Sequence, residues 1–114
     1  MANDRIVYRD YSTLESISPS HNIGQKKVLL SNVETISNIT QLAITQLAAG
    51  DIVEEHVHPT MDEHYIIVSG EGSMQIDKED YVLKVGKFIL VPAGSYHNLS
   101  VTKDIEFIII SVAL

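Results

Sequence analysis

The sequence predicts an all-β domain, either a barrel or a sandwich of short strands. Two observations predict this fold class: short runs rich in Val, Ile and Tyr recur along the chain, and Gly, Pro, Asp or Asn residues separate them. β-branched and aromatic residues favour strands, whereas the separating residues favour tight turns. Apolar residues at helical spacing are scarce, so little helix is expected.

The expected strands follow one another at roughly regular spacing. About nine short strands in such a series are typical of sandwiches and barrels. Turn chemistry separates them at Gly50, Pro59, Gly70-Glu71-Gly72, Asp77 to Asp80, Gly86 and Pro92-Ala93-Gly94. The expected strands are Lys27–Leu30, Thr40–Leu47, Asp51–His56, His64–Ser69, Ser73–Ile76, Tyr81–Val85, Lys87–Val91, Asn98–Val101 and Ile105–Val112.

The first 26 residues are expected to form an N-terminal arm or an edge strand. They contain little apolar patterning, and Pro19 stands among serines. A chain of 114 residues falls in the size range of one domain. The predicted organisation is therefore an arm over residues 1–26 and one barrel over residues 27–114.

Charge and cysteine content narrow the possible functions. Fifteen acidic and eight basic side chains give a net charge of -7, and Lys and Arg form no patch. Nucleic acids and membrane surfaces are therefore not expected as partners. Because the chain has no cysteine, any bound metal must be held by nitrogen and oxygen. The charged start and the absence of a long apolar run predict a cytoplasmic protein.

Histidines concentrate in two short segments. His56 and His58 are separated by one residue, so in an extended strand they point the same way, with backbones about 6.6 Å apart. Pro59 then ends the strand, and a turn can bring Glu63 back beside the pair. His97 follows a Pro-x-Gly turn that could place it on a neighbouring strand.

Three imidazoles and one carboxylate suit a divalent transition metal ion. Such a set favours Fe, Mn, Ni, Co, Cu or Zn over Mg or Ca, which prefer oxygen ligands. A six-coordinate ion would keep two positions open for water, substrate or dioxygen. A lone His-x-His pair on a strand is more often solvent-exposed, so the spacing alone leaves that alternative open.

The spacing around these residues resembles both signature motifs of the cupin family. The resemblance extends from about Lys27 to the C-terminus. In the first motif, Gly50, His56, His58, Glu63 and Gly70 follow one another with five, one, four and six residues between them. In the second motif, Gly86, Pro92, Gly94 and His97 follow one another with five, one and two residues between them.

The resemblance implies a double-stranded β-helix, a jelly-roll-like β-barrel. It also implies one metal ion per chain, held by His56, His58, Glu63 and His97. The family's second motif often carries Asn four residues after its histidine, where this sequence has Val101. That Asn is not a ligand in the family, so neither the metal site nor the fold is in doubt. The fifteen residues between the motifs resemble the compact single-domain cupins of microbes.

The residues around the expected site can be assigned by strand alternation. Tyr65 and Ile67 share the face of Glu63 and, with Leu99, should line a cavity. Tyr96 precedes His97 and is the candidate catalytic residue, because its hydroxyl could orient a substrate at the rim. Glu55 and Glu71 are weaker candidates for proton transfer.

Three further polar residues near the site or in the arm are expected to have no direct role in metal binding or catalysis. Asp62 and His64 flank Glu63 and should face away from it, which makes them surface or interface residues, with His64 only a reserve ligand. His21 lies in the arm and is expected to have no chemical role.

The fold hosts many reactions, so it does not by itself give the activity. The leading hypothesis is a metal-binding cupin that binds or acts on a small polar molecule, possible reactions including that of a dioxygenase. The alternatives are a non-catalytic ligand-binding or sensing module and a sugar isomerase-like cupin. Exposed sheet edges and the arm predict a homodimer.

Overall fold

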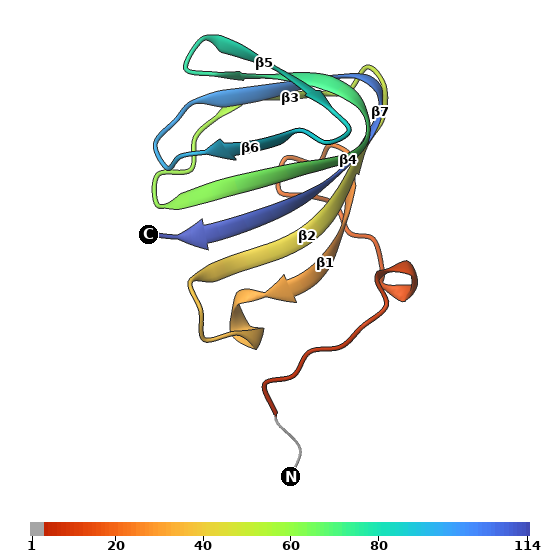
Figure 1. Ribbon diagram of the computed structural model, residues 1–114, viewed down its shortest axis with the longest axis vertical. Helices are drawn as coiled ribbons and strands as arrows, with labels where there is room; N and C mark the ends of the chain where they lie inside the picture. The colour runs from red at the N-terminus through yellow and green to blue at the C-terminus, as the bar shows by residue number, and fades with distance from the viewer. Residues whose placement is uncertain (1–3) are drawn as a thin grey trace.

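A computed structural model describes residues 4–114 of the chain (Figure 1). Strands account for most of it, and the helical part consists of two short 3₁₀ turns, η1 (Tyr11–Thr13) and η2 (Asn32–Glu34). Among the described residues the strands are β1 (Gln25–Ser31), β2 (Ile39–Leu47), β3 (Ile52–His56), β4 (Met61–Ile76), β5 (Glu79–Lys84), β6 (Phe88–Val91) and β7 (His97–Ala113).

All seven strands join one antiparallel sheet that curls into a barrel. The order β1-β2-β7-β4-β5 forms its main path, while β3 pairs with β7 and β6 pairs with β4. The long strands β4 and β7 bend round the barrel and pair along nearly their whole length (Figure 1). This is the double-stranded β-helix that the sequence motifs predicted.

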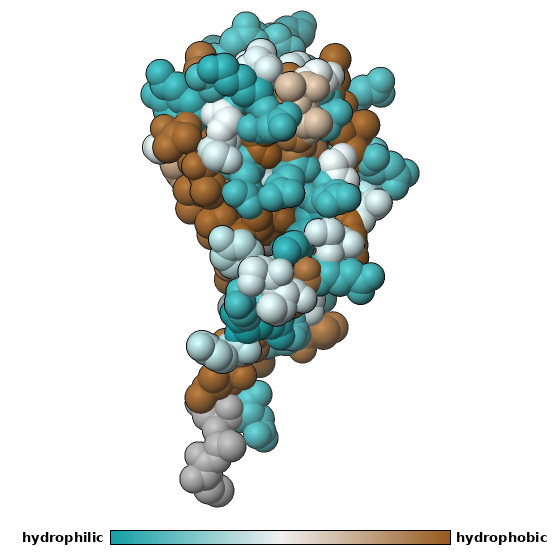
Figure 2. Space-filling model, turned by 90° about the vertical axis from the view of Figure 1, so that its right-hand side faces the viewer, coloured by the Kyte–Doolittle hydropathy of each residue, from teal (hydrophilic) through white to brown (hydrophobic). Residues whose placement is uncertain are grey.

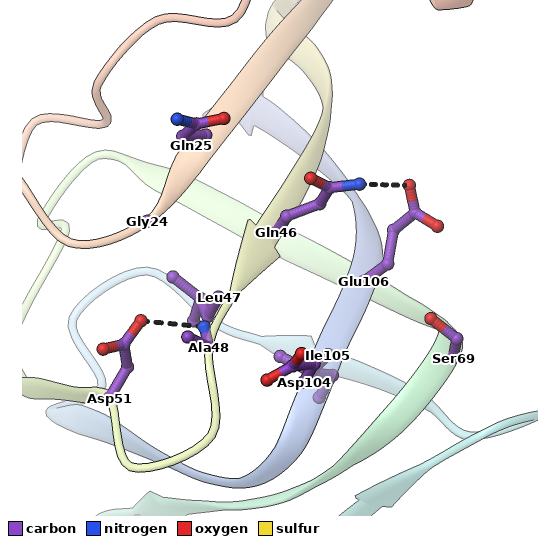
Figure 3. Close-up of a pocket in the computed structure, with 10 residues that line it drawn as sticks. All are labelled: Gly24, Gln25, Gln46, Leu47, Ala48, Asp51, Ser69, Asp104, Ile105 and Glu106. Carbon is purple, nitrogen blue, oxygen red and sulfur yellow. Dashed lines mark hydrogen bonds between the residues drawn. The ribbon is translucent and has the colours of Figure 1, made fainter.

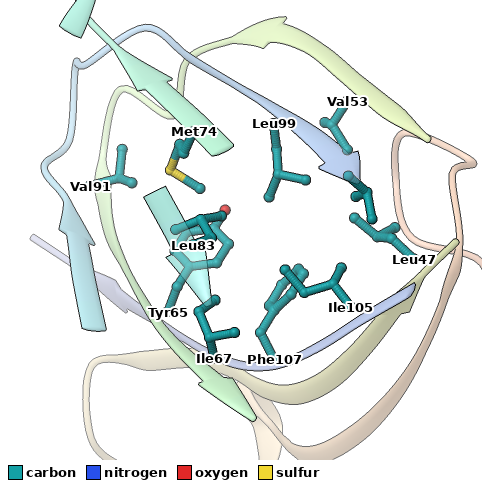
Figure 4. Close-up of a cluster of buried hydrophobic side chains, with 11 residues drawn as sticks. Leu47, Val53, Tyr65, Ile67, Met74, Leu83, Val91, Leu99, Ile105 and Phe107 are labelled. Atoms are coloured by element: carbon teal, nitrogen blue, oxygen red, sulfur yellow. The ribbon is translucent and has the colours of Figure 1, made fainter. Parts of the chain in front are cut away.

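Inward-facing side chains fill the barrel with a hydrophobic core. Along each strand every second residue points inside, as the two-residue period of a strand requires. Figure 4 shows these side chains converging from the surrounding strands. The core residues are Leu47, Val53, Tyr65, Ile67, Met74, Leu83, Val91, Leu99, Val101, Ile105 and Phe107.

Two pairs of expected strands are each one continuous strand, so the sequence prediction of breaks was wrong there. β4 runs through Gly70 and Gly72, and β7 runs through residues 102–104. Pairing between them shifts register near Ser69 and Glu71, which marks β-bulges. Gly70 has φ of +85°, and a Cβ atom there would lie 2.0 Å from the carbonyl oxygen of Asp104. Gly70 therefore marks a bulge and a close backbone approach instead of a turn.

The arm before β1 runs along the outside of the barrel and then returns to it. An antiparallel bridge joins Ile17 to Lys26, and Pro19 is buried. Further out, Arg9 forms an ion pair with Glu34 at 2.7 Å. This ion pair lowers the pKa of the Glu34 carboxyl to about 2, chiefly through the hydrogen bond from Arg9.

The outer face of the sheet carries apolar side chains. Ile66 and Val68 of β4 and Phe88 and Leu90 of β6 are exposed there, and Ile66 is paired with Phe88. Hydrophobic side chains gather along one side of the barrel in Figure 2. None of the helices in the described part of the chain is long and apolar enough to cross a membrane.

The two glycines Gly70 and Gly86 give a matched test of the bulge. Both have positive φ, but a Cβ atom at Gly86 would meet nothing within 4 Å. We expect Gly86→Ala to lower the free energy of unfolding by about 1–2 kcal/mol for the left-handed backbone alone. Gly70→Ala should cost at least about 2 kcal/mol more, because the methyl group overlaps backbone atoms that cannot rotate away. Urea unfolding followed by circular dichroism measures both, and equal losses would contradict the close approach at Gly70.

Candidate metal centre

Strand pairing brings the two histidine segments together. His56 is the last residue of β3 and His97 is the first residue of β7, and the two stand opposite each other in the ladder. Their ring centroids lie 4.2 Å apart. His58 follows in the loop after β3, and its ring centroid is 5.0 Å from that of His56. The sequence therefore separates these imidazoles by about forty residues, but β3–β7 pairing makes them neighbours.

Glu63 completes the cluster from inside the barrel. It is the third residue of β4 and points inward with Tyr65. Its Oε1 atom lies 3.3 Å from Nε2 of His58 and 3.3 Å from Nε2 of His97. One ligand atom from each of His56, His58, Glu63 and His97 lies within 4.8 Å of the others, so the four could hold a metal ion.

Backbone carbonyl groups orient two of the imidazoles. Nδ1 of His56 lies 2.8 Å from the carbonyl oxygen of Glu54, and Nδ1 of His97 lies 3.0 Å from that of Ser95. A carbonyl oxygen only accepts, so each Nδ1 carries the hydrogen atom in the neutral ring. The proton is thereby kept off Nε2, whose lone pair is free for a metal ion, as in many metal sites.

The turn before His97 is tied to the first histidine segment. The carboxylate of Asp62 accepts a hydrogen bond of 2.8 Å from the backbone N–H of Ala93. The N–H of Gly94, where φ is +84°, donates to the carbonyl oxygen of His58 at 2.9 Å. Asp62 is thus a structural tie beside the cluster, and the expectation that it is a surface or interface residue misses this role. His64 faces outward as expected, with Nδ1 2.9 Å from the carbonyl oxygen of Ile110.

Glu63 is a buried carboxylate, with 6% of its surface exposed. Burial raises the pKa of Glu63, but the imidazoles of His97, His58 and His56 outweigh this effect, so the pKa lies below its ordinary value. The hydroxyl group of Tyr65 donates to Glu63 Oε1 at 3.3 Å. Burial, together with the charge of Glu63, raises the pKa of Tyr65 well above 10, so that hydroxyl keeps its proton.

The pKa values of His58 and His97, which lie beside the Glu63 carboxylate, are shifted in opposite directions. Burial lowers the pKa of His58, and the adjacent His56 and His97 lower it further against the opposing effect of Glu63. Burial also acts to lower the pKa of His97, but the nearby carboxylate of Glu63 and the hydrogen bond to the Ser95 carbonyl group raise it overall. Glu63 thus shifts the two neighbouring imidazoles to different net extents, and His97 is the more buried of the two, with 2% of its surface exposed.

The four residues fit a divalent transition metal ion. Nε2 of His97 is buried and has no hydrogen-bond partner of proper geometry in the described structure, although Glu63 is close. Buried nitrogen atoms are rarely left in this state, and a metal ion would satisfy it. Imidazole nitrogen and carboxylate oxygen are ligands that Fe, Mn, Co, Ni, Cu and Zn accept.

A cavity of about 90 Å³ lies beside the cluster, inside the barrel. His56 and His97 form part of its wall, and Tyr65 and Leu99 line it as predicted. Ile67 does not line it, since its side chain is packed in the core. The remaining apolar wall comes from Leu47, Val53, Met74, Phe107 and Ile109.

The structure does not bring the predicted proton-transfer residues to this cavity. Tyr96 is 55% exposed, and its backbone, not its hydroxyl group, makes the hydrogen bonds that fix it to Asp77. Glu55 and Glu71 are exposed as well, and none of these three residues lines the cavity. A catalytic role for Tyr96 stays a prediction that no contact in the described structure supports.

The polar wall of the cavity was not predicted from the sequence. It is formed by Lys26, Gln41 and Thr45 of β1 and β2 and by Ser20 and His21 of the arm. Gln41 and Thr45 were expected only as parts of a strand, and Lys26 as the end of the arm. The alternation of inward and outward positions on β2 was a usable signal, because Gln41 and Thr45 share the face of Leu47. No pattern in the sequence indicates that the arm places His21 here.

A larger groove of about 420 Å³ lies elsewhere on the barrel (Figure 3). Its walls include Gln46, whose amide donates to Glu106 at 3.3 Å, and Asp51, whose carboxylate accepts from the N–H of Ala48 at 2.8 Å. None of the four clustered residues lines it.

Comparison with curated proteins finds distant relatives. The chain is 26% identical over 87 residues to the tetracenomycin polyketide synthase protein TcmJ of Streptomyces glaucescens, covering 75% of this chain and 58% of that protein. It is 24% identical over 74 residues to quercetin 2,3-dioxygenase of Bacillus subtilis, covering 65% of this chain and 22% of that enzyme. The chain thus spans less than two thirds of the length of these relatives.

Solved structures and a family model agree on the fold. A protein of Thermotoga maritima described as a predicted oxalate decarboxylase is 25% identical, with a TM-score of 0.81, covering 92% of this chain and 97% of that one. The model of the cupin domain matches residues 43–113, which contain all four clustered residues and most of the barrel. The chain therefore belongs to the cupin family.

Proposed function

We propose that this cupin binds one divalent transition metal ion through His56, His58, Glu63 and His97 and uses it to bind a small polar molecule. The observation that carries the proposal is the convergence of four ligand atoms within 4.8 Å, with one buried nitrogen left unpaired. When bound, a redox-active ion such as Fe(II) would supply open coordination positions and electrons for dioxygen chemistry. The chain's own residues hold the ligand geometry, and apolar side chains line part of the cavity beside it.

Oxygen-using chemistry is the activity that we favour. The similarity to quercetin 2,3-dioxygenase supports it. The cavity sets a limit on the substrate, because drug-sized molecules occupy sites of roughly 300–1,000 Å³. A space of about 90 Å³ does not accept a multi-ring flavonol, so the substrate would be much smaller than quercetin.

A non-catalytic binding module is the second candidate. The three side chains expected to move protons, those of Tyr96, Glu55 and Glu71, all lie outside the cavity lining. Tyr65 lies inside, but its hydroxyl group is already engaged in a hydrogen bond to Glu63 at 3.3 Å. This scarcity favours ligand binding over proton-transfer chemistry such as that of an isomerase.

Metal titration tests the proposed ligands. We expect one Zn(II) or Co(II) ion per chain and a loss of affinity of more than about 100-fold in His58→Ala, because even residues that only orient ligands contribute 10–100-fold. His64→Ala is the matched control, since His64 faces outward and is bonded to the Ile110 carbonyl. Calorimetry with elemental analysis measures both; equal affinities in the two variants would show that His58 is not a ligand.

Oxygen uptake separates the enzyme from the binding module. After anaerobic loading with Fe(II), the protein should consume oxygen with at least one small chelating substrate from a panel of hydroxy-ketones and hydroxy acids. His97→Ala should abolish this consumption while His64→Ala leaves it unchanged. Tight binding across the panel with no uptake would leave the non-catalytic module as the better description.

We also propose that two copies pair through the apolar outer face of β4 and β6. Ile66, Val68, Phe88 and Leu90 are exposed on it, and an exposed cluster of this kind usually marks an interface. A second copy fits because most oligomers of soluble proteins are symmetric, and an isologous interface sets the same patch against itself. The arm carries further exposed apolar residues, Ile6, Val7 and Tyr8.

Sedimentation velocity at micromolar concentration tests the pairing. The protein should sediment with a mass of twice 12.6 kDa, and Phe88→Glu should convert it to a monomer. Val82→Glu is the matched control, because Val82 is equally exposed but lies on β5, outside this face. A wild-type monomer, or a dimer that survives Phe88→Glu, would contradict the proposed interface.

A further inference from the structure

Polar side chains gather on one wall of the cavity beside the metal-ligand cluster. They are Lys26 of β1, Gln41 and Thr45 of β2, and Ser20 and His21 of the arm. No Asp or Glu belongs to the cavity lining within the described residues. Although the chain has a net charge of -7, the one Lys or Arg in this lining, Lys26, has no acidic side chain beside it there.

Strand register fixes three of these residues. Lys26 stands opposite Thr45 in the β1–β2 ladder, so both side chains point to the same face. Gln41 shares that face because it lies four residues before Thr45. The backbone of Lys26 is held in addition by its bridge to Ile17, with hydrogen bonds of 2.8 and 2.9 Å. Lys26, Gln41 and Thr45 are therefore held by paired strands, whereas His21 is placed by the arm.

The hydrogen-bonding capacity left on this wall consists mainly of donors. Lys26 Nζ donates to Oε1 of Gln41 at 2.9 Å, which engages the oxygen of that amide and leaves its NH₂ group available. Nδ1 of His21 accepts from the N–H of Ile23 at 3.2 Å, so the neutral ring carries its hydrogen on Nε2. The hydroxyl group of Thr45 can also donate. A carboxylate, which only accepts, matches these donors.

Lys26 has no ion-pair partner among residues 4–114. It is partly buried, and this burial lowers the pKa of its ammonium group. A buried or half-buried cation without a counter-charge is unfavourable, because its lost hydration is not replaced. An anionic ligand would supply the missing charge.

The wall lies within reach of the proposed metal ion. Gln41 pairs with Ser111 of β7, and Ser111 pairs with Glu63 of β4, so two strand spacings separate Gln41 from Glu63. At about 4.8 Å per spacing, their backbones are about 10 Å apart. His21 interacts electrostatically with both Lys26 and Glu63. A molecule of a few heavy atoms can therefore touch the wall and the metal-ligand cluster together.

We propose that the ligand of this site is a small carboxylic acid, whose carboxylate binds Lys26, Gln41 and Thr45 while its other end reaches the metal ion. This inference rests on the proposed function, since the metal ion fixes the second end. The cavity volume of about 90 Å³ sets the size. Because one water needs about 10–15 Å³ measured in this way, the cavity holds on the order of six to nine water-sized groups.

Calorimetric titration with malonate and succinate tests the proposal, with neutral malonamide as the comparison ligand. The titrations use the Zn(II)-loaded protein and, separately, the metal-free protein. At least one dianion should bind the wild type more tightly than malonamide does. Lys26→Met should weaken this binding on the order of ten- to a hundredfold, as expected for a lost hydrogen bond to a charged group. Lys26→Arg, which keeps the charge, should retain more affinity than Lys26→Met.

Lys27→Met is the matched control for the change of charge. Lys27 is the next residue of β1 and points to the other face, where its Nζ donates to the carbonyl oxygen of Tyr11 at 3.1 Å. This variant should bind the dianion as the wild type does. Equal weakening in both variants would indicate only a general electrostatic effect and would overturn the assignment to Lys26.

The outcomes separate this inference from the proposed function. Unchanged dianion affinity in Lys26→Met, or no dianion that binds better than malonamide, would overturn the inference even if Zn(II) binds as proposed. Failure of Zn(II) to bind would overturn the metal site. Weaker binding of the dianion to metal-free Lys26→Met than to the metal-free wild type would still support carboxylate binding at the polar wall. Tighter binding of inorganic phosphate than of either dicarboxylate would overturn the choice of a carboxylic acid.

Discussion

A carboxylate buried among imidazoles is the constraint on which the site depends. Moving an ionised carboxyl group out of water costs several kcal/mol, and only nearby compensating groups make this tolerable. Glu63 is 6% exposed, and its compensation comes from His58 and His97, each with Nε2 3.3 Å from Oε1. Neutral imidazoles compensate only in part, whereas a divalent cation would satisfy the carboxylate and the unpaired nitrogen of His97 together.

The surrounding structure serves to hold that arrangement before any ligand arrives. Carbonyl groups fix the rings of His56 and His97, and the Asp62 carboxylate fixes the turn that leads into β7. These ties are local to each segment, but the pairing of β3, β4 and β7 is what joins the segments. Sites carried by paired strands hold their geometry more closely than sites carried by loops, so little reorganisation is needed on binding.

The alternation of apolar runs and turn residues predicted an all-β fold, and the resemblance to the two cupin motifs predicted the barrel type and the four clustered residues. The spacing of His56 and His58 on a strand agreed with that resemblance but did not by itself exclude two solvent-exposed histidines. The bulge at Gly70 could not be predicted, because a glycine with positive φ has the same sequence signature in a turn and in a bulged strand. Tyr96 was expected at the rim of the site but lies outside the cavity lining, and Asp62 was expected at the surface but holds the turn before His97. Both positions depend on how a turn packs against a distant segment.

The polar wall could not be predicted from the sequence for a different reason. Lys26 and His21 are placed by the β1–β2 register and by the return of the arm, both of which are long-range features. A lysine on a strand is ordinarily solvent-exposed, so its sequence gives no sign of a cavity.

The polar wall also affects how an anion could bind in the cavity of a protein with a net charge of -7. Repulsion between the protein and an anion is screened beyond about 8 Å at physiological salt, so distant acidic side chains hardly affect an anion inside the cavity. Inside the cavity the effective dielectric constant is lower, so the ammonium group of Lys26 attracts an anion more strongly there than it would in water. Selection of an acid would therefore be decided by contacts within the barrel and would depend little on salt. The affinity of the site for an acid would then depend mainly on the direct contacts of its carboxylate with Lys26 and Gln41.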